Sequence, residues 1–154
     1  MGTHRGISGV YQCKFPAKFA GKDPNQVEFR SLLERSYMKF FDTHPSVEVW
    51  GYEQNIIPYV IEMEGQIIDP KVRRYFVDFF VKFREKDGKI KKYLIEIKPK
   101  TFTQKPKVPK NGPTKAYQER LLEYYKNESK WTTAAKYCAS HDAVFKVLTE
   151  DDLK

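Results

Sequence analysis

Two segments decide the fold predicted for this chain: Arg74-Tyr75-Phe76-Val77-Asp78-Phe79-Phe80-Val81 and Tyr93-Leu94-Ile95-Glu96-Ile97-Lys98. Both are rich in β-branched and aromatic residues, which are typical of buried strands. Asp78 interrupts the first run, and Glu96 and Lys98 interrupt the second. Burying a lone carboxylate is costly unless something pairs with it. Two carboxylates on neighbouring strands repel each other, and a divalent cation is the usual remedy.

A tight turn is expected between these segments, because residues 85–89 are Glu-Lys-Asp-Gly-Lys and Asp-Gly is a strong hairpin signal. We therefore predict strands over about 73–83 and 91–98. Side chains alternate between the two faces of a strand. A single register can then bring Asp78 beside Glu96, with Lys98 one pleat further along.

The composition limits the class of protein. With 154 residues, of which 40% are hydrophobic, the chain is expected to form one folded domain rather than a disordered segment. It carries 28 Lys and Arg against 20 Asp and Glu, a formal net charge of +8. This excess favours a polyanionic partner, nucleic acid first and an anionic membrane surface second. No apolar run approaches the length of a membrane span.

Helical and strand-like patterns flank the two segments. A first helix is predicted over about 25–42, capped by Asn25 or Asp23, with Glu34 at the edge of its apolar stripe. A second is predicted from the cap Thr114 to about Cys138. The remaining expectations are an extended arm over 1–26, strands over 47–52, 56–61 and 143–148, a turn over 64–66, and a basic, Pro-rich loop over 99–113.

Carboxylates that hold Mg²⁺ can supply what phosphodiester hydrolysis needs, namely an activated water and charge relief at the phosphate. A nearby lysine can orient or deprotonate that water. The alternative is ordinary: Glu-x-Lys is common on a solvated strand face with a cross-strand ion pair. By itself, Glu34 would be an exposed helix carboxylate near Arg30 or Arg35. The loop lysines could serve solubility alone, although we favour phosphate contacts.

Three motifs resemble those of the PD-(D/E)XK nuclease superfamily, in its TnsA-like branch of transposon endonucleases. They are Phe29-Arg30-Ser31-Leu32-Leu33-Glu34, Tyr75-Phe76-Val77-Asp78-Phe79 and Tyr93-Leu94-Ile95-Glu96-Ile97-Lys98-Pro99-Lys100. The stretch from Trp50 to Pro58, with Tyr52-Glu53-Gln54, fits that branch as well. The arm Phe15-Pro16-Ala17-Lys18-Phe19-Ala20-Gly21 is similar to that of the small head-completion nucleases of T-even-type tailed bacteriophages. One departure is Val77, where the family usually has Pro.

The resemblance implies an α/β, restriction-endonuclease-like domain over 27–154, preceded by the arm over 1–26, with a central mixed sheet flanked by helices. It implies a Mg²⁺-dependent DNA endonuclease, with Mn²⁺ as a substitute. Asp78, Glu96 and Glu34 would be metal ligands or their supports, and Lys98 the catalytic lysine. Glu53 is a further candidate at the site. The residues expected to bind DNA are Arg30, Arg74, Lys100, Lys105, Lys107 and Lys110.

The resemblance also implies a biological setting. Double-stranded DNA would be the substrate, phage portal or neck proteins further partners, and the host bacterial cytoplasm or the virion head the location. Two alternatives stay open: a non-catalytic DNA-binding or portal-plugging protein, and a dimeric structure-specific resolvase.

Overall fold

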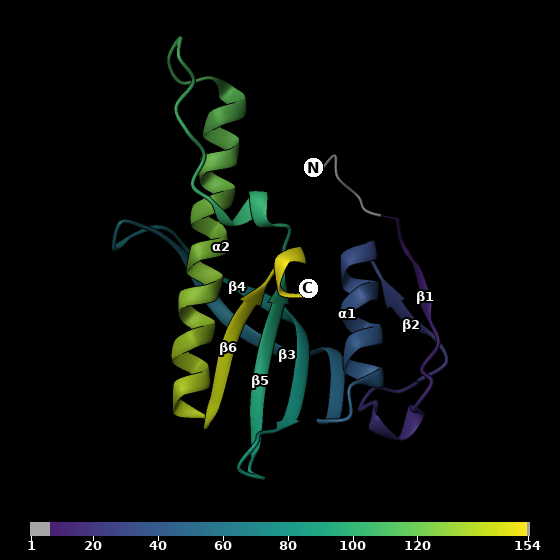
Figure 1. The fold of residues 1–154 in the computed structure, drawn as a ribbon. Coiled ribbons are helices and arrows are strands. Elements are labelled where there is room, and N and C mark those ends of the chain that lie inside the picture. Colours follow the sequence, from purple (N-terminus) through teal and green to yellow (C-terminus); the bar gives the residue numbers. More distant parts are fainter. Residues whose placement is uncertain (1–6, 154) are drawn as a thin grey trace.

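A mixed four-stranded sheet forms the centre of the computed structural model, which describes residues 7–153 (Figure 1). Its strand order is β3-β4-β5-β6. The bounds are β3 Val47–Met63, β4 Gln66–Arg84, β5 Ile90–Ile97 and β6 Ala143–Leu148. β4 runs antiparallel to both β3 and β5, whereas β6 pairs in parallel with β5. The mixed sheet of the predicted fold class is therefore confirmed.

The strand register places the two acidic segments side by side, as predicted. Phe79 lies opposite Ile95, and Phe80 lies opposite Leu94. Continuing this register by one residue sets Asp78 opposite Glu96. The turn after β4 contains Gly88 at φ 86°, a left-handed conformation that glycine adopts without steric cost. The Asp-Gly signal thus located the hairpin correctly.

One helix covers each face of the sheet (Figure 1). α1, Leu32–Thr43, packs on a core with Trp50 and Phe79 at its centre. α2, Lys115–Ser140, packs on a second core that includes Ile57 and Leu94. Burial of these apolar side chains is the main favourable contribution to such packing. Both helix starts are capped by side chains, since Ser31 accepts from the N–H of Glu34 and Thr114 from that of Tyr117.

The predicted first helix began too early in the chain. Residues Val27–Phe29 form the strand β2, which pairs antiparallel with β1, Gly9–Tyr11. Val27 and Phe29 are buried while Glu28 between them is exposed, which is the period of a strand. The helical spacing also predicted Leu32 and Phe40 in the apolar stripe of this helix, whereas the structure exposes both side chains.

The segment predicted as two strands, over 47–52 and 56–61, is the single strand β3 with an irregularity between Tyr52 and Asn55. Within it, Glu53 has a φ of 53°, an uncommon conformation for a residue with a side chain. β4 begins well before the predicted residue 73, because it continues along β3 to the turn at Glu64 and Gly65.

The first residues described wrap around the α1 side of the domain, as expected of an arm. The carboxylate of Asp42 on α1 is fully buried and fastens this segment. It accepts hydrogen bonds from the hydroxyl of Tyr11 at 2.5 Å and the backbone N–H groups of Lys14 at 2.7 Å and Phe15 at 3.1 Å. The arm-to-domain division at residue 26 stays a prediction, and residues 1–6 of the arm lie outside the described part.

The loop between β5 and α2 follows the predicted basic segment and contains a short 3-10 helix, η2, over Lys100–Thr103. This loop and the first turns of α2 project beyond the end of the sheet (Figure 1). Two further short helices, η1 Pro16–Lys18 and η3 Glu150–Leu153, complete the secondary structure. In the described residues, no helix is both long and apolar enough to cross a membrane.

Candidate active site

Asp78 on β4 and Glu96 on β5 lie next to each other at the point where the pairing of the two strands ends. The paired backbone of the two strands ends at Phe79 and Ile95, and beyond that point the side chain of Asp78 accepts the backbone N–H of Ile97 at 2.8 Å. Glu96 is buried, at 7% exposure, and accepts a hydrogen bond from the hydroxyl of Tyr75 at 2.8 Å. The motif carboxylates are thus held in place by neighbouring groups rather than by an ion pair with Lys98.

The two carboxyl groups share one electrostatic environment. Burial raises the pKa of Asp78 well above its ordinary value, and the charge of Glu96 raises it further. A side-chain interaction with Glu96 and the charge of Glu34 act on the pKa of Asp78 in the same direction. Two adjoining acidic groups that disfavour each other's charge form an arrangement that a divalent cation stabilises.

Glu34 contributes a third carboxylate from the start of α1. It is buried, and one oxygen accepts the backbone N–H of Arg30 at 2.7 Å and the hydroxyl of Tyr52 at 3.2 Å. Burial raises the pKa of Glu34, and its charge contributes to raising the pKa of Asp78. The helical prediction put Glu34 at the edge of the core, whereas the structure buries it at the Ser31 cap.

A cleft of about 540 Å³ opens beside the carboxylates. It is lined by Arg30, Glu53, Arg74, Tyr75, Phe76, Asp78, Glu96 and Lys130. Arg30 and Arg74, predicted to bind DNA, therefore lie at the same opening as the motif acids. The guanidinium of Arg30 forms two hydrogen bonds of 2.7 Å with Glu53, so in this state both side chains are engaged with each other.

Lys98 lies immediately beyond Ile97, and its backbone N–H donates to the carbonyl of Leu148 on β6 at 3.0 Å. Its side chain is partly buried and does not belong to the set that lines the cleft. Its charge acts on Lys130, whose pKa it helps to lower. The structure thus places Lys98 near the site without a direct contact to the carboxylates in the described residues.

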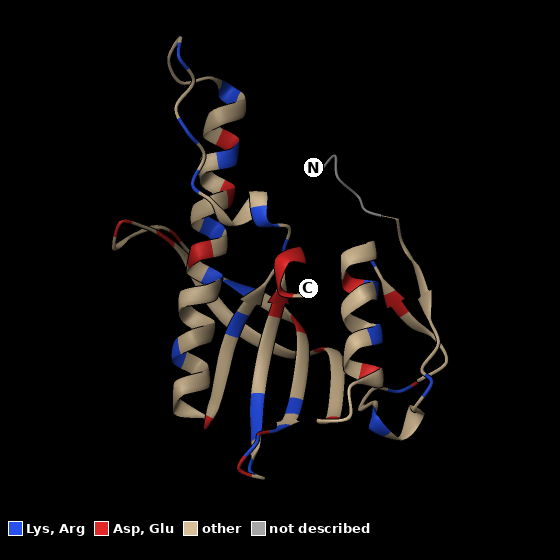
Figure 2. Cartoon of the chain, in the orientation of Figure 1, with Lys and Arg blue, Asp and Glu red and all other residues tan. Residues whose placement is uncertain are grey.

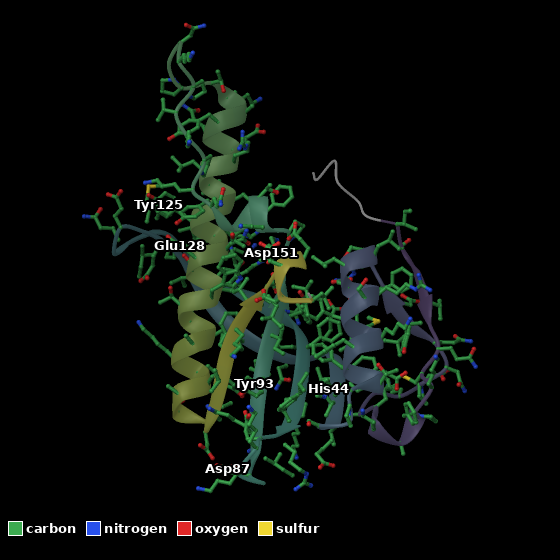
Figure 3. The ribbon with its side chains drawn as sticks, viewed as in Figure 1. His44, Asp87, Tyr93, Tyr125, Glu128 and Asp151 are labelled. Atoms are coloured by element: carbon green, nitrogen blue, oxygen red, sulfur yellow. The ribbon has the colours of Figure 1, made fainter. Side chains whose placement is uncertain are left out.

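The loop lysines are exposed, but two have partners. Lys100 forms an ion pair of 3.2 Å with Asp151, which Figure 3 labels on the η3 segment. The ammonium of Lys105 lies over the ring of Tyr125 on α2, 5.5 Å from its centroid. Figure 2 shows the basic residues of this loop and of the adjoining turns of α2 on the part that projects beyond the sheet.

Sequence patterns missed Lys130 and the roles of the tyrosines. Lys130 lies four residues before Ala134 and eight before Cys138, so it shares the face of α2 that these two buried residues occupy. A lysine on an otherwise buried helix face could have been recognised in the sequence as a candidate functional residue. Tyr75 and Tyr52 lie within the motif segments, but their hydroxyl contacts to Glu96 and Glu34 depend on the packing of the strands.

The donor set fits a divalent cation of the Mg²⁺ class. Asp78 and Glu96 provide hard carboxylate oxygens, and Mg²⁺ needs only one or two protein carboxylates because it keeps several waters. The pKa of Asp78 is raised first by burial and then by the charge of Glu96, and a bound cation would offset the second effect. Over residues 7–153 no three acidic, His or Cys side chains are grouped closely enough to hold a metal in this state.

The order of elements, the mixed sheet and the paired strand carboxylates define a restriction-endonuclease-like α/β domain. The family described as "TnsA-like endonuclease N terminal" matches residues 44–150, more than half of the chain. The chain belongs to this TnsA-like family of the PD-(D/E)XK nucleases. Asp78, Glu96 and Lys98 lie inside the matched range, whereas Glu34 precedes it.

A curated relative extends the similarity over nearly the whole length. The chain is 35% identical over 150 residues to a protein named "Head completion nuclease" from Enterobacteria phage T4. The aligned region covers 96% of this chain and 93% of the relative. The similarity therefore includes the arm and α1 as well as the family domain.

Proposed function

We propose that the chain is a metal-dependent DNA endonuclease that acts during phage head completion. The observation that carries this proposal is the pairing of Asp78 with Glu96 at an open cleft, with the pKa of Asp78 raised by burial and by Glu96. The TnsA-like family supports nuclease chemistry, and the T4 relative supports the head-completion setting. Double-stranded DNA is the proposed substrate, with the net charge of +8 favouring its approach.

Each side chain has a role in this proposal. Asp78 and Glu96 hold the cation, Mg²⁺ or Mn²⁺ in its place, and Glu34 supports the site from α1. When bound, the cation would neutralise charge at the phosphate and lower the pKa of a bound water, so that the resulting hydroxide could act as the nucleophile. Tyr75 keeps Glu96 oriented through its 2.8 Å hydrogen bond. Lys98 orients or deprotonates the attacking water from the strand end.

The biological setting is part of the same proposal. The T4 relative's name supports a role in head completion. We extend the proposal to DNA of the filled head as the substrate, portal or neck proteins as neighbours, and the host bacterial cytoplasm or the virion head as the location. Within that setting the basic loop would hold the duplex while the cleft receives one phosphodiester.

The test is cleavage of supercoiled plasmid by the purified protein with Mg²⁺, Mn²⁺, Ca²⁺ or EDTA. Nicked and linear products are expected with Mg²⁺ and Mn²⁺, and none with EDTA. Asp78→Asn and Glu96→Gln should abolish cleavage. Asp69→Asn is the matched control, because Asp69 lies on the same strand but pairs at 2.9 Å with Arg73 away from the cleft.

Three outcomes would contradict the proposal. Cleavage by Asp78→Asn at the wild-type rate would exclude the carboxylate site. DNA binding without cleavage under any cation would instead support the alternative of a DNA-binding or portal-plugging protein. Preference for branched over plasmid DNA, by a dimer, would favour the resolvase.

A further inference from the structure

Lys130 brings a cation to the cleft from the opposite layer of the domain. It lies on α2, whereas the motif carboxylates come from the sheet and from α1. The side chain is partly buried and lines the same cleft as Asp78 and Glu96. The position of α2 beside the cleft is fixed by packing, because Ala134, one turn after Lys130, is fully buried in the second core.

The surroundings of Lys130 restrict where its ammonium group can go. It lies 5.5 Å from the ring centroid of Tyr75 and 5.9 Å from that of Tyr59, in the geometry of cation–π contacts. The hydroxyl of Tyr75 in turn donates to Glu96. The ring that orients a proposed metal ligand therefore also positions the lysine, and both groups face the same opening.

The charge of Lys130 is incompletely compensated. Within residues 7–153, the four ion pairs within 4.0 Å do not include this lysine. Burial is the largest effect on the pKa of Lys130 and lowers it. The charges of Lys126 and Lys98 lower it as well, whereas those of Glu96 and Glu123 raise it. A partly buried ammonium group without a close counter-ion is costly unless an anion joins it.

The other two cations of the cleft differ in this respect. The side chain of Arg30 is 68% exposed and is bonded to Glu53. Arg74 is exposed and stacks over Phe76, 5.5 Å from the ring centroid. Lys130 is the partly buried member, and desolvated charges stabilise developing charge more strongly than solvated ones.

We propose that Lys130 is a further catalytic residue, whose ammonium group binds a non-bridging oxygen of the scissile phosphate from the α2 side of the cleft. This inference rests on the proposed nuclease function and adds a second layer to its site. Negative charge on the phosphoryl oxygens must be stabilised during hydrolysis. A protonated lysine serves there as a point charge. Asp78 and Glu96 act on the attacking side, and Lys130 on the phosphate itself.

The experiment compares Lys130→Met, Lys130→Gln and Lys130→Arg with Lys136→Met. Lys136 lies on the same helix, about 240° around its axis from Lys130, and is exposed. Single-turnover cleavage of supercoiled plasmid is measured with Mg²⁺. Affinity for a short duplex is measured with Ca²⁺ in place of Mg²⁺, and thermal unfolding of every variant in EDTA.

Lys130→Met and Lys130→Gln should lower the cleavage rate by about 10²–10³-fold, as the removal of one preorganised donor does elsewhere. Duplex affinity should change by less than about threefold, because a single phosphate contact contributes little to total counterion release. Lys130→Arg should recover at least part of the rate, since it restores the charge. Lys136→Met should match the wild type in rate.

Three results would overturn the inference. Cleavage by Lys130→Met and Lys130→Gln at the wild-type rate, with Asp78→Asn inert, would leave the proposed function intact and reduce Lys130 to packing on the tyrosines. A lower cleavage rate accompanied by a lower unfolding temperature in both variants, with no recovery of the rate by Lys130→Arg, would show a structural role. An inert wild type with every cation would instead refute the nuclease function itself, and the role of Lys130 with it.

Discussion

Asp42 and Asp78 are two aspartates held inside one small domain by opposite means. Asp42 is fully buried on α1 and receives three donors, from Tyr11, Lys14 and Phe15. Asp78 receives one backbone donor, from Ile97, and faces a second carboxyl group on Glu96. The three donors around Asp42 satisfy its carboxylate within the chain, without any added ion. The surroundings of Asp78 leave negative charge for something outside the chain to neutralise.

Burial alone therefore does not mark a functional acid. The number of donors around the carboxylate and the sign of its neighbours separate the two cases. The contrast also supplies two matched pairs of variants. One pair changes Asp42 and Asp78, and the other changes a lysine near each of these aspartates.

The largest contrast is expected between Lys98 and Lys18. Lys98→Ala should lower turnover by about 10²–10⁴-fold, the usual contribution of a positioned proton-transfer group, with little change in DNA affinity. Lys18 donates to the carbonyls of Asp42 and His44, both at 2.9 Å, so Lys18→Ala should cost stability and leave turnover intact. Single-turnover cleavage, duplex binding and urea unfolding separate these effects. Equal losses of binding and turnover in Lys98→Ala would make Lys98 a phosphate contact only.

The next effect concerns Asp42. Asp42→Asn should lower the free energy of unfolding by about 3 kcal/mol, because several donors lose a charged acceptor. Cleavage by the folded variant should stay close to that of the wild type. Urea titration monitored by tryptophan fluorescence measures the first quantity, and the plasmid assay the second. A folded Asp42→Asn protein that no longer cuts would remove the distinction between the two aspartates.

A smaller effect is expected from the basic loop, whose lysines lie far from Asp42 and Asp78 in the sequence. Replacing Lys105, Lys107 and Lys110 with Ala should weaken binding on all duplex sequences alike. The slope of log affinity against log salt should flatten by about 0.9 for each phosphate that is no longer neutralised. The loop's proline content prevents a recognition helix, so base discrimination should not change.

The matched control for the loop removes the same charge near the turn between β4 and β5, through Ala at the exposed residues Lys86, Lys89 and Lys91. That turn lies at the opposite end of the sheet (Figure 1). An identical flattening in the control would mean that the loop has no special role in holding DNA.

The smallest effect is on stability at Asp78, and its sign is opposite to that at Asp42. The folded state raises the pKa of Asp78 through burial and Glu96, so the fold favours the protonated form. That contribution is fully present below the unfolded pKa of about 3.9 and is lost as pH rises through the folded value. In EDTA, Asp78→Asn should therefore raise the unfolding midpoint at pH 7.5 by about 3 °C per kcal/mol relieved, and the gain should shrink at pH 4. A midpoint lowered at pH 7.5 would show that Asp78 is stabilised as Asp42 is.

The sequence allowed the strands and the acidic pair to be predicted because those signals are local. The Asp-Gly turn fixes the hairpin, and alternation then places Asp78 beside Glu96. The start of α1 was predicted wrongly because β2 depends on its partner β1, about eighteen residues earlier in the chain. Lys130 was missed for a similar reason, since its place at the cleft depends on how α2 docks on the sheet.

The parallel pairing of β5 with β6 has a consequence for the moment at which the site is completed during synthesis. Glu96 lies opposite Val147 in that pairing, and Tyr37 of α1 donates its hydroxyl to the carbonyl of Thr149 at 2.6 Å. β6 is the last of the four strands to leave the ribosome, and until it docks β5 is an edge strand with unpaired backbone groups. A nascent chain thus has all its motif acids long before it has a finished site. The strand that carries Glu96 and precedes Lys98 therefore acquires its second neighbour only when the chain has been made as far as residue 148.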